Sequence, residues 1–187
     1  MATGKGQLPT LHPVTGFKLG IASAGIKTPG RKDLVVMEIA EGSTVAGLFT
    51  QNAFCAAPVT IAKAHLASTT PKYLLINTGN ANAGTGEKGL SDALQSCDVL
   101  AAITSVKKDQ ILPFSTGVIG ELMPMDRLLK GLPIAAAALS EEGWADAAAA
   151  ILTTDTRAKG ASLQYGKGRK ITMTGITKGS GMIKPNM

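Results

Sequence analysis

Apolar residues recur along the chain with the spacing of strands in several places. Residues 34–40 and 43–50 are rich in aliphatic and β-branched residues and lie two residues apart, which predicts a β-hairpin. Residues 73–77 predict a third strand and residues 110–114 a fourth. Because proline has no N–H group for a ladder hydrogen bond, Pro113 restricts the fourth strand to an edge or an end of a sheet.

A helical spacing follows the third strand. Leu90, Leu94, Cys97 and Ala101 recur at intervals of three and four residues, which places them on one face of a helix over residues 87–105. This pattern predicts an amphipathic helix that packs on a sheet.

The second half of the chain alternates differently. The alanine-rich stretch 132–154 predicts two short helices, with Ser140 as the N-cap of the second. Residues 161–165 and 170–176 predict strands joined by a glycine-containing turn. Mixed helices and strands with an antiparallel last third indicate an α/β fold, an α+β layered sandwich, in a single domain over residues 1–187.

Composition adds expectations about partners and location. The chain is 44% hydrophobic, yet it has no apolar run of the length that a membrane helix needs, so we expect excess apolar surface to contact another polypeptide. The first residues lack the apolar segment of a secretory signal, which favours the cytoplasm. The net charge is +6 with only 4% aromatic residues, which argues against nucleic acid and suits small dicarboxylate substrates.

The cysteines and histidines carry little chemistry. Cys55 and Cys97 lie too far apart for a metal-binding spacing, and we expect buried free thiols and no metal. His12 and His65 are the two histidines, and neither is spaced for a catalytic triad. If the protein catalyses acyl chemistry, its base is therefore not histidine.

A glycine-rich stretch offers a nucleotide-binding alternative. Residues 84–89, GTGEKG, match G-x-G-x-x-G between a strand and a helix. A polar segment separates the strand from the first glycine, and an acidic partner at the required distance is missing, so the match is weak. An ordinary glycine-rich loop is the favoured interpretation, and a non-catalytic nucleotide-binding module remains the alternative.

Three stretches can bear catalytic or binding groups. In residues 115–121, backbone N–H groups and the Thr116 hydroxyl would suit an oxyanion hole, although taken alone the pattern favours a helix N-cap. Residues 153–156, TTDT, would end a helix or form the polar wall of a pocket. Lys178, beside flexible glycines, is a surface cation or a ligand for a substrate carboxylate.

Taken together, these stretches resemble one family. The end of the chain, KGSGMIKPNM, closely resembles the segment before the self-cleavage site of the glutamate N-acetyltransferase family, also called ornithine acetyltransferase, of arginine biosynthesis. Further segments occur in the order that is typical of the family and cover nearly the whole chain: FTQNAFCAAPV, INTGNANAGTGEKG, PFSTGVIGE, TTDT and TKGSGMI.

The resemblance implies an architecture and a partner. The family's precursor is cleaved between Ala and Thr, so this sequence is expected to be the α chain, and a separate β chain that begins with the catalytic Thr is expected to complete it in an α2β2 assembly. The family's fold resembles that of N-terminal nucleophile hydrolases. This sequence ends at Met187, without the Ala that precedes the cleavage point in the family.

The resemblance also implies a reaction and its residues. Thr116 and Gly117 match the oxyanion hole, and Thr153 and Lys178 match positions that contact substrate. The Thr of the β chain would take the acetyl group of N-acetylornithine and pass it to glutamate, with its own amine as base. No bound cofactor is implied; acetyl-CoA is a further donor in some members, which the sequence leaves open here. A related self-cleaving aminopeptidase is the alternative enzyme.

Overall fold

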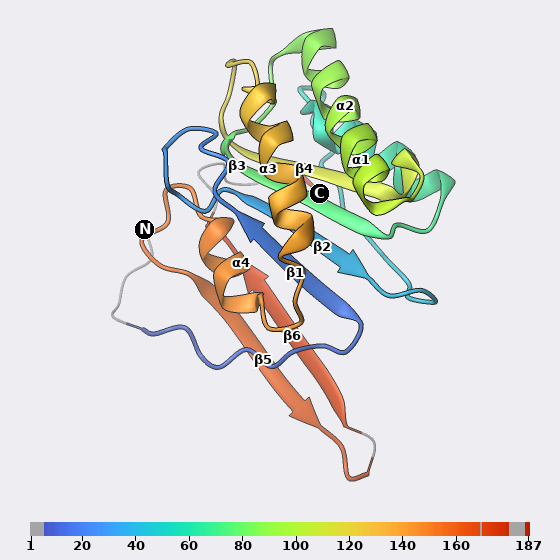
Figure 1. Ribbon diagram of the computed structural model, residues 1–187, viewed down its shortest axis with the longest axis vertical. Helices are drawn as coiled ribbons and strands as arrows, with labels where there is room; N and C mark the ends of the chain where they lie inside the picture. The colour runs from blue at the N-terminus through green and yellow to red at the C-terminus, as the bar shows by residue number, and fades with distance from the viewer. Residues whose placement is uncertain (1–5, 169, 180–185) are drawn as a thin grey trace.

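The chain folds around a four-stranded sheet with the order β1-β2-β3-β4 (Figure 1). The structure, a computed structural model, describes residues 6–168, 170–179 and 186–187. Neighbouring strands are antiparallel except β3 and β4, which are parallel. The strands are β1 (Phe17–Ala22), β2 (Leu34–Ile39), β3 (Tyr73–Asn80) and β4 (Ile111–Val118).

Helices cover the sheet on both faces. Helix α2 links the parallel strands β3 and β4, as a parallel connection requires a crossover. Side chains of α2 and α3 join the core on one face of the sheet, and α4 packs on the other. The helices are α1 (Ala57–Ser68), α2 (Gly86–Thr104), α3 (Met125–Ala137) and α4 (Trp144–Ala150), with a short 3-10 helix at Lys108–Gln110.

The central strand β2 shows why the sheet needs two covers. Its side chains alternate between the faces: Leu34 and Val36 belong to the core layer under α2 and α3, whereas Val35 and Met37 belong to the layer under α4. All four are buried. A strand that is apolar on both faces can be stable only between two packed layers.

A separate two-stranded sheet forms the lower end of the molecule in Figure 1. It consists of β5 (Lys159–Tyr165) and β6 (Ile171–Thr177), paired antiparallel. One face is held against the N-terminal segment, because the Ser162 hydroxyl accepts the N–H of His12 at 3.0 Å and the Thr174 hydroxyl donates to the His12 carbonyl at 2.6 Å.

Most predicted elements are confirmed, with shifted ends. Strands form at 34–39, 73–80 and 111–118, and the 161–176 hairpin is present. Strand β4 contains Pro113 and is an edge strand, as expected. The α/β fold class is therefore right. Strand β1 and helix α1 were not predicted.

The prediction of a strand over residues 43–50 is wrong. These residues have no regular structure, and Leu48 is 81% exposed. The reason is tertiary: β1 and β3 occupy both edges of β2, so no position is left for a following hairpin strand.

The predicted cap at Ser140 is also wrong. Helix α4 begins at Trp144 with Gly143 as its N-cap, and Ser140 instead bridges to Leu19 of β1. The Leu19 N–H donates to the Ser140 carbonyl at 2.9 Å. The residue thus fixes the chain between α3 and α4 against the sheet.

The predicted helix face is rotated slightly. On α2, Cys97 and Ala101 are buried as expected, but Leu90 is 37% exposed and Ala93 and Leu100 are buried in its place. Burial, reinforced by the nearby charge of Asp98, raises the pKa of the Cys97 thiol to about 12, so this thiol is an inert core group.

In the described part of the chain, no helix has both the length and the apolar character to cross a membrane.

Candidate active site

The four site residues proposed from the sequence line one open cleft of about 730 Å³. The cleft lies where the parallel strands β3 and β4 end, the position at which open α/β sheets commonly bind ligands. The loop after β1, the segment after α4 and the end of β6 complete it. Its described lining is Lys27, Thr28, Arg31, Ala56, Gly79, Ala81, Ala83, Ser115, Thr116, Gly117, Val118, Ile119, Thr153, Thr154 and Lys178.

The backbone at Gly117 is shaped by close approach to the neighbouring strand. Gly117 pairs with Gly79, and the register shifts between Gly79 and Asn80 form a bulge. Gly117 has φ 142°, and a Cβ added to it would lie 2.3 Å from the carbonyl carbon of Gly79. Only glycine fits this position.

This geometry suits an oxyanion hole. Strand β4 is an edge strand, so part of its backbone hydrogen-bonding capacity faces away from β3. The half-buried Thr116 has no hydrogen-bond partner for its hydroxyl among the described residues. The helix-cap alternative is wrong, because Ser115 and Thr116 lie in β4 and α3 begins only at Met125.

A network of buried asparagines supports the strand ends. The Ser115 hydroxyl donates to Asn77 Oδ1 at 2.6 Å, and Asn77 Nδ2 donates to the Asn80 carbonyl at 2.8 Å. Asn80 Nδ2 in turn donates to the carbonyl of Glu121 at 3.0 Å, beyond the end of β4. These bonds tie the end of β3 to the segments on both sides of Thr116, so they hold the backbone around Thr116 in place.

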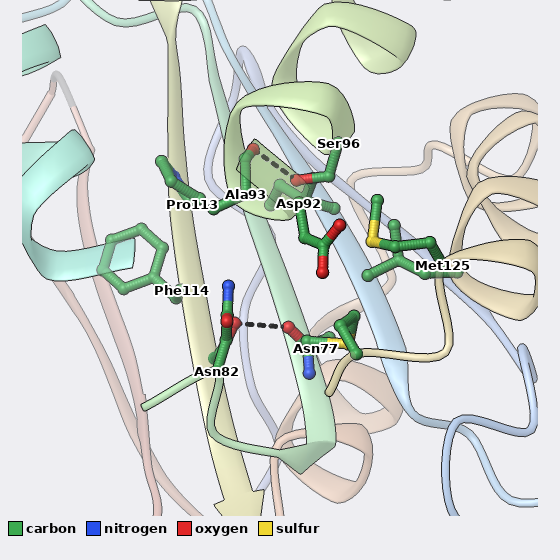
Figure 2. A pocket seen from close by; sticks show the side chains of 12 residues that line it. Asn77, Asn82, Asp92, Ala93, Ser96, Pro113, Phe114 and Met125 are labelled. Carbon is green, nitrogen blue, oxygen red and sulfur yellow. Dashed lines mark hydrogen bonds between the residues drawn. The ribbon is translucent and has the colours of Figure 1, made fainter. Parts of the chain in front are cut away.

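Behind this network lies a small cavity of about 10 Å³, shown in Figure 2. Asp92 of α2 extends toward it, and its Oδ2 is buried without a hydrogen-bond partner among the described residues. The other carboxylate oxygen pairs with Lys88. The cavity is about the size of one water molecule, and it is separate from the open cleft.

The glycine-rich loop has a structural explanation. Asn82 Nδ2 donates to the Gly89 carbonyl and Asn82 Oδ1 accepts the Thr85 hydroxyl, both at 2.9 Å. A Cβ at Gly89 would lie 2.0 Å from Thr85 Oγ1. Because Glu87 adds negative charge to the first turn of α2, this helix end is also poorly suited to a phosphate. Gly89 thus serves internal packing, whereas Gly84 and Gly86 have positive φ values of 69° and 59°.

Thr153 and Lys178 enter the cleft from two different elements. Thr153 follows the end of α4, and Lys178 follows β6. The Lys178 ammonium donates to the Gly179 carbonyl at 2.6 Å, and the Gly179 N–H donates to Asp155 Oδ1 at 2.6 Å. Residues 180–185 of the KGSGMIKPNM motif lie outside the described residues.

Asp155 is the charged group that organises this corner. Burial acts to raise the pKa of its carboxyl, but the hydrogen bonds from Lys159 and the Gly179 N–H and the charges of Lys159 and Lys178 outweigh burial. The pKa of Asp155 therefore lies below its ordinary value. The ionised carboxylate holds the chain near Lys178.

Sequence reasoning missed the contribution of the loop between β1 and β2. Lys27, Thr28 and Arg31 of this loop line the cleft. The Arg31 guanidinium donates to the carbonyl of Leu152, next to Thr153. The available signal was a basic, glycine- and proline-containing turn directly after an apolar segment, which is too common to identify a site.

Neither histidine belongs to the described lining of the cleft. His65 is buried, with Nδ1 2.7 Å from the Ile111 carbonyl, and His12 contacts the β5–β6 hairpin. Within the described ranges, no group of three His, Cys, Asp or Glu side chains is placed to hold a metal ion. Among the described residues, a histidine base is therefore not available to a reaction in this cleft.

The chain is an α/β protein in which a cleft at the ends of two parallel strands contains a hydroxyl without a partner among the described residues and several cationic side chains. The family to which it belongs follows from comparison: the model of the ArgJ family matches residues 18–187, and the chain belongs to this family. It is 61% identical over 188 residues to the arginine biosynthesis bifunctional protein ArgJ of Pseudomonas fluorescens, covering 100% of this chain and 46% of that protein. The chain thus spans about half the length of the curated relatives it matches.

Two solved structures share the fold. The arginine biosynthesis bifunctional protein ArgJ of Bacillus halodurans matches with a TM-score of 0.82 and 35% identity, covering 92% of this chain and 91% of that chain. The ornithine acetyltransferase of Mycobacterium tuberculosis, solved in complex with ornithine, matches with a TM-score of 0.83 and 32% identity, covering 91% of each chain. The fold is therefore that of the ornithine acetyltransferases, of the N-terminal nucleophile type.

Proposed function

We propose that this chain is the α part of a glutamate N-acetyltransferase, which transfers an acetyl group from N-acetylornithine to glutamate in arginine biosynthesis. The observation that carries the proposal is the convergence of Thr116, Gly117, Thr153 and Lys178 on one cleft. These residues come from three separate parts of the fold, so their meeting does not follow from their order along the chain.

The proposed reaction runs through an acetyl-enzyme. The N-terminal Thr of the β chain attacks the acetyl carbonyl, and its amine takes the hydroxyl proton. The Thr116 hydroxyl and the Gly117 N–H stabilise the oxyanion of the tetrahedral intermediate. The C–N bond breaks, the proton passes to the leaving amine, and ornithine departs. The amine of glutamate then attacks the acetyl-Thr ester, which gives N-acetylglutamate and restores the hydroxyl.

A partner β chain from the same precursor is supported by chain lengths. The chain covers 46% of the curated relative but 91% of each of the two crystallised chains. A separate polypeptide of about this length therefore exists in both solved structures, as cleavage of a longer precursor would produce. We propose autocatalytic cleavage before the catalytic Thr, an α2β2 assembly and a cytoplasmic location.

The exposed face of the β5–β6 hairpin also supports a partner. Leu163 pairs with Met173 and Tyr165 with Ile171, so these side chains share one face of the hairpin. Each is more than half exposed. A row of large apolar side chains on a two-stranded sheet is typical of a surface that another polypeptide covers.

The proposal requires neither a metal nor a tightly bound cofactor. Acetyl-CoA as an additional acetyl donor stays a prediction that a direct assay decides. The full, cleaved enzyme would be supplied with glutamate and either N-acetylornithine or acetyl-CoA, and N-acetylglutamate would be measured.

The Thr116→Ala variant of the full enzyme tests the proposed oxyanion hole. We expect kcat to fall by about 10²-fold or more while substrate affinity and the melting temperature stay near wild type. Thr60→Ala, an exposed threonine on α1, is the matched control and should leave kcat unchanged. A normal kcat with a lowered melting temperature in Thr116→Ala would refute the oxyanion role.

Lys178→Ala tests the substrate-binding role. Loss of a charge-assisted contact should raise KM by roughly 10- to 100-fold with little effect on the melting temperature. Unchanged KM values for both N-acetylornithine and glutamate would remove Lys178 from the site. In all these assays, peptide hydrolysis without acetyl transfer would instead identify the related self-cleaving aminopeptidase.

A further inference from the structure

The loop between β1 and β2, the blue loop near the N-terminal label in Figure 1, carries an exposed lysine into the cleft. The buried Asp33 fixes this loop on the N-terminal side of Lys27. Its carboxylate accepts the N–H of Ala24 at 2.7 Å and the N–H of Ile26 at 2.6 Å. The Arg127 guanidinium adds a bond to the Gly25 carbonyl at 3.0 Å. The backbone that leads into Lys27 is therefore held in one position.

The side chain of Lys27 starts directly beside the oxyanion-hole strand. A Cβ added to Gly79 would lie 2.9 Å from the Cβ of Lys27, and Gly79 is the residue that pairs with Gly117. Gly79 has φ 101°, a conformation that favours glycine. The absence of a side chain at this position leaves room for the first part of the lysine chain next to the strand ends.

The cationic side chains of the cleft differ in the hydrogen bonds and ion pairs that they already form. Lys178 donates to the Gly179 carbonyl and lies close enough to Asp155 to lower its pKa. Arg31 donates to the Leu152 carbonyl. Among the described residues, Lys27 has neither a hydrogen bond nor an ion pair. Its ammonium is thus the cation of the cleft that is most available to a ligand.

The surroundings of Lys27 leave its charge unbalanced on the cleft side. No Asp or Glu belongs to the described lining of the cleft. Lys27 also lines the neighbouring hollow with Glu121, Asp126 and Arg127, and neither carboxylate pairs with Lys27 in the part of the chain that the structure describes. A cleft that contains cations and no described acid attracts an anionic ligand.

We propose that Lys27 binds the side-chain carboxylate of the acetyl acceptor and so selects an acidic amino acid. This assignment rests on the proposed function, in which one site serves two amino acids with opposite side-chain charges. An ammonium at Lys27 attracts the carboxylate of glutamate and repels the ammonium of ornithine. It therefore favours entry of glutamate over return of ornithine once the acetyl-enzyme has formed.

The test uses the full, cleaved enzyme with glutamate and its neutral analogue glutamine as competing acceptors. Lys27→Met keeps most of the side-chain length and removes the charge. We expect kcat/KM for glutamate to fall by roughly 10- to 100-fold, as for loss of a charge-assisted contact, while kcat/KM for glutamine changes by less than about threefold. Lys27→Arg should retain part of the preference for glutamate.

Two further measurements show whether the effect is specific to the charge at Lys27 and to the acceptor step. Lys63→Met removes an exposed charge on α1, away from the cleft, and should leave the preference for glutamate at the wild-type value. The rate of acetyl-enzyme formation from N-acetylornithine should not fall in Lys27→Met, because that donor has no side-chain carboxylate and carries a side-chain ammonium that Lys27 repels.

Each outcome decides the matter. Equal losses for glutamate and glutamine, or no loss for glutamate, in a Lys27→Met enzyme that melts like wild type would overturn the assignment. A wild-type enzyme that transfers no acetyl group to glutamate would overturn the proposed function, and this assignment with it. The first result appears only in the variant and the second already in the wild type, so the two failures are distinguishable.

Discussion

Strands β3 and β4 form one pair of adjacent strands, and β5 and β6 form another. The two pairs differ in how far their side chains are buried. Between core layers, Leu75 of β3 and Ile111 of β4 are almost completely buried. On the hairpin, Leu163 and Met173 are 61% and 67% exposed. Both pairs form a backbone hydrogen-bond ladder, and they differ in the burial of their side chains. The first pair has apolar side chains buried within this chain, and the second has large apolar side chains exposed on one face.

The molecule therefore has a sheet that its own helices cover on both faces and a hairpin with one exposed apolar face. The four-stranded sheet and its helices bury a core on both faces. The hairpin contacts the core layer under α4 through the face that carries Ile176. An isolated two-stranded sheet is at best marginally stable in water. We therefore expect the chain alone to be aggregation-prone and inactive.

The largest effect is expected where the two glycines of the paired strands meet. Gly117→Ala places a Cβ 2.3 Å from the backbone of Gly79 at a φ that favours glycine, so it should destabilise the full enzyme by roughly 3–5 kcal/mol or prevent folding. Gly175→Ala on β6 is the control, because a Cβ there has no atom within 4 Å. Urea denaturation of both variants measures the contrast. Similar losses at the two positions would contradict the comparison.

Truncation of a core residue should destabilise the protein somewhat less than Gly117→Ala. Leu100 on α2 is fully buried, so Leu100→Ala should lower the free energy of unfolding by about 2–5 kcal/mol. In this chain alone, Met173→Ala on the hairpin should change the free energy of unfolding by less than about 0.5 kcal/mol, because Met173 is exposed. If the chain alone precipitates, the same pair is compared by limited proteolysis of freshly refolded material. A large effect of Met173→Ala there would mean that the hairpin face is already packed.

The hairpin itself should respond differently once the full enzyme is assembled. If the remaining polypeptide covers its apolar face, Met173→Asp should destabilise the assembly by about 1–3 kcal/mol, because a charge would be buried there. Ala161→Asp near the base of the hairpin and Lys167→Asp at its turn provide a graded series along it. Thermal unfolding of the assembled enzyme reports the effect. Wild-type melting of Met173→Asp would show that the face stays exposed.

The smallest effect is expected from the pH dependence of Asp155. Its folded-state pKa is below the ordinary value, so the ionised carboxylate stabilises the fold at pH values above the unfolded pKa of about 4. This contribution is lost as the pH falls through the folded-state pKa. Asp155→Asn should therefore lower the melting temperature at pH 7, and the difference from wild type should shrink below about pH 4.

Asp146→Asn is the control for this measurement. Asp146 pairs with Lys32 on the surface, where its side chain is 60% exposed, so its removal should have little effect at any pH. A constant difference between wild type and Asp155→Asn across the acid range would contradict the proposed role of the ionised carboxylate.

Much of the fold could be predicted from local pattern. The apolar run at 34–39, the helix at 86–104 and the hairpin about residues 166–170 have a spacing that only one kind of element satisfies. The wrong strand prediction at residues 43–50 has a tertiary cause. Residues 43–50 have strand-like composition, but β1 and β3 already flank β2, and local composition carries no information about which edges are occupied.

The candidate site, like the fold, could be predicted from the sequence only in part. Its members Thr116, Gly117, Thr153 and Lys178 could be named because their short motifs resemble those of a family, and their roles remain proposals. The sequence could not show that Thr116 belongs to a strand end and is no helix cap, since a hydroxyl residue before glycine fits both.

The sequence by itself determined the kinds of element, the apolar excess and the family, because each depends on residue type and order. The tertiary structure alone decided which chain segments meet. It brought Lys27 of the β1–β2 loop beside Gly79 and Gly117, residues far away along the chain. The physical reason is that strand pairing and helix packing fix the positions of the strand ends, and the loops at those ends line the cleft.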